Sequence, residues 1–358
     1  MSSDLTTNTY PASSLLGHRA PERILTIRLG AVGDVVTVLP ALQALTRLWP
    51  RSHIHHLVEE GARDVVTGFP GVEKVITIPR KQLKHDLLRG RVALLQSLRT
   101  QLRQGQYDAV VDFQNLLRSA LWTSFTHAPL RVVRNNWREL SPLWFNVRMR
   151  YQPELNVVHQ HCALLESLVP RGTQLDIAAA PIAIDEQANA AAEQALRAAG
   201  IEGPFTLLAP GSRWVARALP DRVTARLIHV LNRRKHQLLL VGGPNERGAL
   251  EKLGTELALP VNTSLALKPL AAVIARARLL VCVDSAPMHI ADMLRIPMLT
   301  LFGPSSPALY GPVFAPFRSL RLERLEGQHD FRGSSEDYFS WIDEPLIERA
   351  LDEVPRAA

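Results

Sequence analysis

The stretch from Leu279 to Pro307 constrains the fold of this chain more than any other. It begins with five apolar residues in the pattern of a strand that is buried on both faces of a parallel sheet. Asp284 and Ser285 follow with oxygens suited to capping a helix, and apolar residues at helical spacing come next. Such a junction binds anions in open α/β sheets, because the first N–H groups of the helix are unpaired. A second apolar strand ends at Gly303, where a ligand can approach the backbone, so the two loops predict a diphosphate site.

The length and composition predict a soluble protein with two globular domains. The chain has 358 residues, of which 46% are hydrophobic and 21% are charged. No apolar run reaches the roughly 18 to 20 residues of a membrane span. Residues 1–22 lack the pattern of a signal peptide and are expected to form a disordered tail, which predicts a cytoplasmic protein. Cys162 and Cys282 lie in helix and strand patterns and are expected to be packed thiols.

Strand and helix patterns alternate in the first half of the chain, as in a doubly wound α/β domain. The opening strand, residues 23–29, leads through a glycine turn into a helix predicted over residues 35–47. The turn has the spacing G-x-x-G-D, which differs from the dinucleotide-binding G-x-G-x-x-G. Gly33 would let a ligand approach the backbone. Asp34 stands at the helix start, where it suits either a catalytic base or a local cap, and these residues alone leave both roles open.

The regular alternation stops at residues 126–152, which we interpret as a functional loop region, and restarts after a glycine- and proline-containing linker. The predicted parts are a tail over 1–22, an N-terminal Rossmann-like domain over 23–172, a linker over 173–184, a C-terminal Rossmann-like domain over 185–335, and a C-terminal helix over 336–358 that packs back on the N-terminal domain. We expect these α/β domains to face each other across a central cleft, lined by loops from the ends of strands.

The loops that follow strands in the second half suit a nucleotide. Ser212 lies in the first of them and offers a hydroxyl group, and Arg213 and Arg217 carry charges that can pair with phosphates. Glu246, in a glycine-rich loop, can accept hydrogen bonds from ribose hydroxyls. For either arginine, a solvated surface role is the alternative.

The chain carries a net charge of +7, and its basic residues gather over residues 80–91 and 131–150. Such clusters suit an acidic substrate, an anionic membrane surface or nucleic acid, and a plain solvated surface is the alternative for each. The sequence has no nucleic-acid-binding signature, so we expect no nucleic-acid partner.

The combined motifs resemble the ADP-heptose:lipopolysaccharide heptosyltransferases of glycosyltransferase family 9, which have the GT-B fold. The resemblance extends from about Arg23 to Val354 and depends on the order and spacing of several segments. These include IRLGAVGDVVTVLPAL from Ile27, YDAVVDFQNLLRSAL from Tyr107, LVGGPNE from Leu240 and VDSAPMHIADMLRIPMLTLFGPSSP from Val283.

This resemblance implies an inverting transfer of heptose from ADP-heptose to the inner core of lipopolysaccharide, with no metal or cofactor. It makes Asp34 the general base that deprotonates the acceptor hydroxyl, and it matches Glu246 to the carboxylate on the nucleoside side. The residues that match the family's diphosphate loop are Asp284, Ser285 and Ala286, with His289 nearby. The basic residues that fall where relatives bind the acidic groups of the acceptor are Arg80, Lys81, Lys84 and Arg138.

Three departures from the family pattern leave the donor sugar open. Ala286 replaces a glycine, Arg217 stands where a lysine is common, and the region after Leu325 does not follow the usual ending. The alternatives are an enzyme that uses another nucleotide sugar, an epimerase or hydrolase of the same fold, or a non-catalytic binder of sugar nucleotides. The retained Gly33–Asp34 pair argues against the last. The expected partners are a nucleotide-sugar donor and an anionic glycolipid, met by peripheral association at the inner face of the inner membrane.

Overall fold

The computed structural model describes residues 20–136, 138–166, 168–169, 173–322 and 333–355. The chain forms two compact units, Met1–Ala180 and Pro181–Ala358, so the division falls inside the stretch predicted as a linker. Most of the predicted N-terminal tail, residues 1–19, lies outside the described residues.

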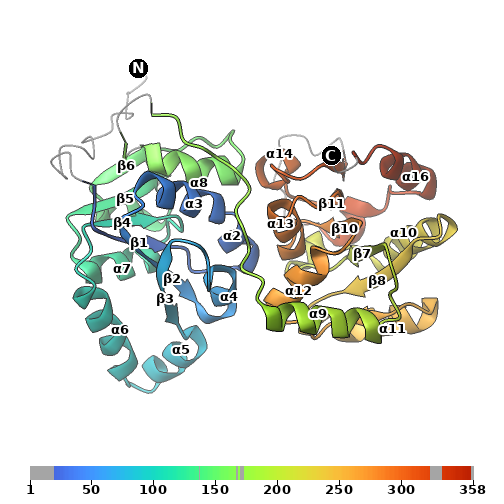
Figure 1. Cartoon of the computed structure of the whole chain (residues 1–358), viewed down its shortest axis with the longest axis horizontal. Helices are drawn as coiled ribbons and strands as arrows, with labels where there is room; N and C mark the ends of the chain where they lie inside the picture. The colour runs from blue at the N-terminus through green and yellow to red at the C-terminus, as the bar shows by residue number, and fades with distance from the viewer. Residues whose placement is uncertain (1–19, 137, 167, 170–172, 323–332, 356–358) are drawn as a thin grey trace. The chain divides into compact units, whose positions relative to one another are not determined.

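Unit 1 contains a parallel six-stranded sheet in the order β3-β2-β1-β4-β5-β6 (Figure 1). The strands are β1 (Arg23–Ile27), β2 (His53–Glu59), β3 (Val72–Ile78), β4 (Ala109–Asp112), β5 (Leu130–Asn135) and β6 (Val147–Arg150). The helices are α2 (Val32–Val36), α3 (Leu39–Leu48), α4 (Arg63–Val66), α5 (Arg80–Leu88), α6 (Ala93–Gln104), α7 (Leu117–Thr126) and α8 (Val157–Glu166), with short 3₁₀ turns η1 (Glu60–Ala62) and η2 (Arg138–Trp144). This strand order is that of a Rossmann domain, with its switch point between β1 and β4.

Two predictions for unit 1 were wrong. Residues 126–152 include β5 and β6 in addition to loops. The sequence did not predict these strands, because both lie towards one edge of the sheet and carry arginines that break the apolar pattern. The helix predicted over residues 35–47 is interrupted between α2 and α3, where Pro40 occupies the first turn of α3. Proline suits that position but cannot continue a helix from the preceding turn.

Unit 2 repeats the Rossmann order, as β12-β11-β10-β7-β8-β9, again parallel. The strands are β7 (Phe205–Ala209), β8 (Gln237–Val241), β9 (Val261–Asn262), β10 (Leu279–Val283), β11 (Met298–Phe302) and β12 (Phe317–Arg321). The helices are α9 (Glu186–Ala198), α10 (Asp221–Arg233), α11 (Arg247–Leu257), α12 (Leu267–Ile274), α13 (Ala286–Met293), α14 (Pro307–Tyr310), α15 (Ser335–Phe339) and α16 (Glu344–Asp352), with 3₁₀ turns η3 (Val215–Arg217) and η4 (Pro244–Glu246). Every residue of β7, β10 and β11 is buried, which explains their continuous apolar sequences.

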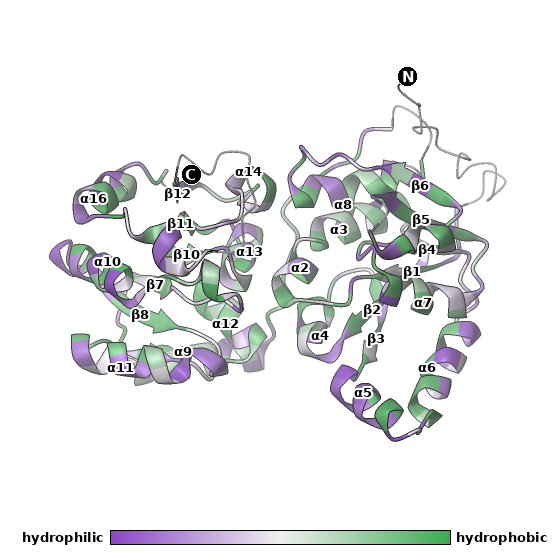
Figure 2. Ribbon diagram, turned by 180° about the vertical axis from the view of Figure 1, so that it is seen from behind, coloured by the Kyte–Doolittle hydropathy of each residue, from purple (hydrophilic) through white to green (hydrophobic). Residues whose placement is uncertain are grey.

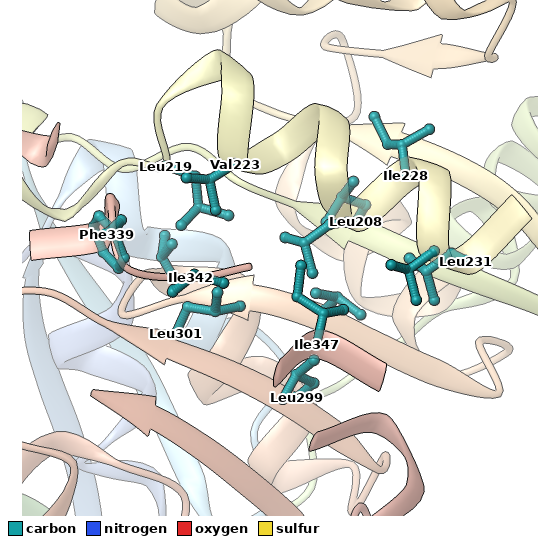
Figure 3. Packing of buried hydrophobic residues seen from close by; sticks show 14 of the residues in the cluster. Leu208, Leu219, Val223, Ile228, Leu231, Leu299, Leu301, Phe339, Ile342 and Ile347 are labelled. Atoms are coloured by element: carbon teal, nitrogen blue, oxygen red, sulfur yellow. The ribbon is translucent and has the colours of Figure 1, made fainter. Parts of the chain in front are cut away.

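The C-terminal segment belongs to the core of unit 2. It contains two helices, α15 and α16, in place of the single helix predicted. Phe339, Ile342 and Ile347 are fully buried and pack in one cluster with Val223 of α10 and Leu301 of β11 (Figure 3). The apolar face of this segment therefore contributes to the core of the second unit. Its packing against the N-terminal domain stays a prediction.

Two buried histidines make unit 1 sensitive to acid. Burial lowers the pKa of His56 to about 3, and burial together with the charges of Arg134 and Arg28 lowers the pKa of His161 well below its ordinary value. The unfolded chain therefore binds protons more readily, and stability is lost as the pH falls below about 6.5. Asp112 opposes this effect, because burial raises its pKa to about 6. Protonation of Asp112 between about pH 6 and 4 therefore increases the free energy of unfolding. Two histidines outweigh one carboxyl group, so the net effect is a loss of stability in acid.

We predict that the free energy of unfolding falls between pH 6.5 and 4, by up to about 1.4 kcal/mol per pH unit for each proton taken up. His161→Leu should make this slope shallower, because the leucine cannot take up a proton on unfolding. Urea unfolding at a series of pH values measures the slope, and His229→Leu, at an exposed position, is the control. An unchanged slope in His161→Leu would show that His161 is not responsible.

Candidate functional site

Asp34 lies at the carboxyl end of β1, in the first turn of α2. Its Oδ2 accepts a hydrogen bond from the Ala31 N–H at 3.1 Å and lies 3.1 Å from Nη2 of Arg28. The side chain is still 52% exposed. Asp34 therefore caps the helix and forms an ion pair, while its carboxylate stays open to a reactant.

Arg28 was missed in the sequence, although it is a charged residue directly after an apolar strand. It is 8% exposed, and its Nη1 donates to the Phe113 carbonyl at 2.8 Å. Because Phe113 follows β4, Arg28 ties the ends of β1 and β4 together at the switch point. The ion pair with this largely buried arginine thus fixes the position of the Asp34 carboxylate.

A second carboxylate at the same end of the sheet brings two arginines together. Glu59, the last residue of β2, lies 3.4 Å from Nη1 of Arg80 and 3.2 Å from Nη1 of Arg118. The arginines are 61% and 38% exposed, and Glu59 is 19% exposed. Arg80 is therefore directed to the carboxyl edge of the sheet, as a role in acceptor binding requires, and Arg118 joins it without having been predicted.

The other predicted acceptor-binding residues lie at different places in unit 1. Gly33 lies half-buried in the first turn of α2, next to Asp34. Lys81 and Lys84 are exposed on α5. Arg138 begins η2, and its side chain lies outside the described part of the chain.

In unit 2, Asp284 is the centre of a buried ionic cluster at the end of β10. It is 4% exposed, its Oδ2 lies 3.0 Å from Nη1 of Arg217, and its Oδ1 lies 3.7 Å from Nε2 of His289. Burial by itself would raise the pKa of Asp284, but His289, Arg217 and the Ser305 hydroxyl hold that pKa below its ordinary value. The carboxylate is thus kept charged in the interior by its neighbours.

This cluster changes the role expected of Arg217. Its guanidinium group is already paired with Asp284, so a phosphate would bind beside an existing ion pair and not to an isolated cation. Arg213, in the same loop, is exposed. The Ser212 Oγ accepts a long hydrogen bond, 3.4 Å, from the Trp214 N–H.

The start of α13 offers backbone donors to an anion. Ser285 is the N-cap and Ala286 the first helical residue, and both are only partly buried. The Ser285 hydroxyl donates to the Val283 carbonyl at 3.3 Å, so it does not cap the helix. The first N–H groups of α13 therefore suit a diphosphate oxygen.

Glu246 folds back on its own loop. Its Oε2 accepts a hydrogen bond from the Gly243 N–H at 2.6 Å. A Cβ at Gly211 or at Gly242 would lie within 2.8 Å of this carboxylate, so both glycines make room for it. Glu246 thus lies between the loops after β7 and β8, and one of its carboxylate oxygens already accepts a hydrogen bond from the backbone.

Asp292 is a further buried carboxylate that sequence reasoning missed. It accepts backbone hydrogen bonds from Val313 at 3.0 Å, Phe314 at 2.7 Å and Ala315 at 2.9 Å, so it fixes the segment that leads into β12. Burial outweighs these bonds and raises its pKa. The only signal in the sequence is an acidic residue among apolar helical neighbours.

Gly303 has a packing role that the sequence did not indicate. It is buried, and a Cβ built on it would lie 2.9 Å from the Ala216 carbonyl oxygen and 3.1 Å from the Phe339 ring. The space beside its Cα is therefore filled by the protein itself, whereas the prediction placed a ligand there.

We predict that Gly303→Ala destabilises the protein by about 1–3 kcal/mol, because the methyl group must displace a backbone carbonyl and a buried ring. Gly248→Ala is the control, since a Cβ there meets nothing within 4 Å and alanine favours the helix. The urea unfolding midpoints of the two variants test this prediction. Equal midpoints for Gly303→Ala and Gly248→Ala would contradict the packing role of Gly303.

The carboxyl ends of the strands of unit 2 thus converge on the loop after β7. Residues 211–217 contact Glu246 after β8, Asp284 after β10 and Gly303 after β11. Among the described residues, no three His, Cys, Asp or Glu side chains lie together as a metal site would require. The arrangement suits an anionic ligand held by amides and a balanced ion pair.

Comparison with known proteins identifies the family. The sequence profile of Glycosyltransferase family 9 (heptosyltransferase) matches residues 95–337. The chain belongs to this family. It is a glycosyltransferase, as the resemblance of its motifs predicted.

Individual members of glycosyltransferase family 9 match over most of their length. Lipopolysaccharide heptosyltransferase 1 of Pseudomonas aeruginosa is 29% identical over 300 residues, which cover 81% of each chain. The crystal structure of a family 9 glycosyl transferase from Veillonella parvula matches with a TM-score of 0.78 at 22% identity, over 93% of this chain and 97% of that one. The E. coli heptosyltransferase WaaC with ADP matches with a TM-score of 0.71 at 22% identity, over 93% and 100%. These likenesses confirm the predicted GT-B fold with two Rossmann-like domains.

Proposed function

We propose that this chain is an inverting heptosyltransferase that transfers heptose from ADP-heptose to the inner core of lipopolysaccharide, or to a related envelope glycolipid. The observation that carries the proposal is Asp34, an exposed carboxylate that a buried arginine holds at the switch point of unit 1. Relatives named lipopolysaccharide heptosyltransferase support the acceptor, and solved relatives hold ADP and an ADP-heptose analogue.

In the proposed reaction, Asp34 takes the proton of an acceptor hydroxyl while the oxygen attacks the anomeric carbon of heptose. The new C–O bond forms as the bond from that carbon to the β-phosphate oxygen breaks, and ADP leaves with the electron pair. Negative charge grows on the diphosphate, so donors that face it stabilise the transition state. These donors are the first N–H groups of α13 and the Arg217 guanidinium. On the ribose side, Glu246 accepts hydrogen bonds from the hydroxyl groups.

We propose that transfer needs no metal ion or cofactor, because amides and a guanidinium supply the charge that the leaving group requires. The acceptor is anionic, and the exposed Arg80, Lys81 and Lys84 suit it. We place the enzyme in the cytoplasm, bound peripherally at the inner face of the inner membrane. Activity in the presence of EDTA tests the metal-free reaction.

Isothermal titration with ADP, UDP, GDP and ADP-heptose tests the donor. We expect ADP and ADP-heptose to bind more tightly than UDP or GDP, after which transfer is measured on truncated lipopolysaccharide. If only UDP or GDP bound, the proposed donor would be wrong, but the proposed class of reaction, glycosyl transfer from a nucleotide sugar, would be retained. Binding of none would favour a non-catalytic relative.

A further inference from the structure

The turn between α5 and α6 is a rigid tip at the end of unit 1 (Figures 1 and 2). The Arg91 N–H donates to the Asp86 carbonyl at 2.8 Å, and the Gly90 N–H donates to the Leu87 carbonyl at 3.0 Å. Gly90 has φ +68°, so these two bonds form a Schellman motif with glycine in its left-handed position. The backbone of the tip is therefore fixed by its own hydrogen bonds.

This tip exposes apolar side chains. Leu88 is 78% exposed, Leu87 is 43% exposed and Val92 is 46% exposed, and no residue of α5 is buried. A single exposed leucine is ordinary on a protein surface. Three large apolar side chains at one turn, however, form a patch that would gain free energy by leaving water.

The patch is surrounded by positive charge. The exposed cations of α5 and of the turn are Arg80, Lys81, Lys84, Arg89 and Arg91, with the exposed His85 beside them. The single acidic residue between positions 80 and 92 is Asp86, whose side chain is 17% exposed and lies 3.7 Å from Nδ1 of His85. The tip therefore combines exposed apolar residues with exposed cations. Figure 2 shows hydrophobic and hydrophilic residues next to one another along the ribbon where α5 joins α6.

We propose that residues 84–92 form the element by which this protein inserts into an anionic lipid surface. Leu87, Leu88 and Val92 would lie at the boundary of headgroups and acyl chains, and the basic side chains would pair with lipid phosphates. In the described part of the chain, no helix is long and apolar enough to cross a membrane. This inference rests on the proposed function for one point, namely that the lipid surface is the one carrying the glycolipid acceptor.

The position of the tip agrees with that role. Arg80, at the other end of α5, reaches the carboxyl edge of the sheet through Glu59. At about 1.5 Å per residue, the helix sets the tip roughly 12 Å from Arg80 along its axis. Nucleic acid would explain the basic residues but not the exposed leucines, and the segment has no Phe, Tyr or Trp for stacking on bases.

Flotation of the full-length protein with vesicles tests the proposal. We expect binding to vesicles of phosphatidylcholine and phosphatidylglycerol mixed three to one, and much weaker binding to phosphatidylcholine alone. Leu88→Ser should weaken binding to the mixed vesicles roughly tenfold, because the leucine no longer enters the apolar layer. Arg89→Gln should weaken it about fivefold, and that effect should shrink in high salt.

Leu121→Ser is the matched control, because Leu121 is 47% exposed on α7. Equal binding by the wild type and Leu88→Ser would overturn the proposal, as would a larger effect of Leu121→Ser. A dimer that Leu88→Ser dissociates, without any vesicle binding, would instead identify the tip as a contact between copies. Salt-sensitive binding to RNA, in place of vesicles, would also overturn it.

The outcome is separable from that of the proposed function. ADP titration and transfer to a water-soluble acceptor fragment should be unchanged in Leu88→Ser, because Leu88 is not one of the predicted donor-binding, acceptor-binding or base residues. If the wild type binds vesicles but not ADP, the proposed function fails and the tip assignment stands. If the wild type binds ADP but not vesicles, the tip assignment alone fails.

Discussion

Replacing Asp34 with asparagine should lower the rate of heptose transfer by roughly a hundredfold to ten-thousandfold, the usual contribution of a general base. Asparagine keeps an oxygen that can accept the Ala31 N–H, so the first turn of α2 should remain intact. It cannot accept the proton of the acceptor hydroxyl. The measurement is the rate of ADP release at saturating ADP-heptose with truncated lipopolysaccharide as acceptor.

Two further readouts separate lost chemistry from lost structure. Affinity for ADP, which the proposed function assigns to unit 2, should be unchanged in Asp34→Asn, and so should the midpoint of urea unfolding. Asp64→Asn, at an exposed acidic residue in the first turn of α4, is the matched control and should retain full activity. If Asp34→Asn transferred heptose at the wild-type rate, Asp34 would be only a helix cap that pairs with Arg28.

The sequence predicts best where the chain is buried most completely. β7, β10 and β11 are buried along their whole length, so their apolar sequences identify them as parallel strands without further information. The loops that follow such strands must lie at one edge of the sheet, which is why the donor residues can be grouped from the sequence alone.

Prediction is weaker at the edges of both sheets. β6 and β12 are edge strands, and charged residues interrupt the apolar pattern of each, so neither was predicted. β9 has only two residues. An edge strand needs fewer apolar residues because one side has no partner strand, and its sequence resembles that of a loop.

The side-chain pairing at the site could not be derived from the sequence at all. Arg217 and Asp284 come from loops after different strands, and only the folded sheet brings the two loops together. Arg28 and Asp34 lie close in sequence, yet their pairing depends on the anchor that the Phe113 carbonyl provides. Gly303 shows the same limit, because the sequence does not reveal whether a missing side chain leaves room for a ligand or for Phe339.

Replacing Arg217 with methionine should destabilise unit 2 by about 3 kcal/mol, the lower end of the range for breaking a buried ion pair. The lower end applies because Arg217 is 20% exposed, so water offsets part of the loss, whereas Asp284 is 4% exposed. The carboxylate would lose the nearer of its two basic neighbours, since His289 lies farther away at 3.7 Å. Arg233→Met is the matched control, because Arg233 pairs with Glu344 and Glu348 on the surface and should contribute less than about 1 kcal/mol.

A double-mutant cycle decides whether the pair itself is responsible. Asp284→Asn removes the buried charge, so Arg217→Met should cost less stability in that background than in the wild type. Equal costs in the two backgrounds, or equal unfolding midpoints for Arg217→Met and Arg233→Met, would contradict the assigned pairing. Affinity for ADP gives a second readout: Asp284→Asn retains the cation, so its affinity should exceed that of Arg217→Met. This order follows if Arg217 also faces the diphosphate, because a phosphate can then compensate the charge that Asp284 no longer balances.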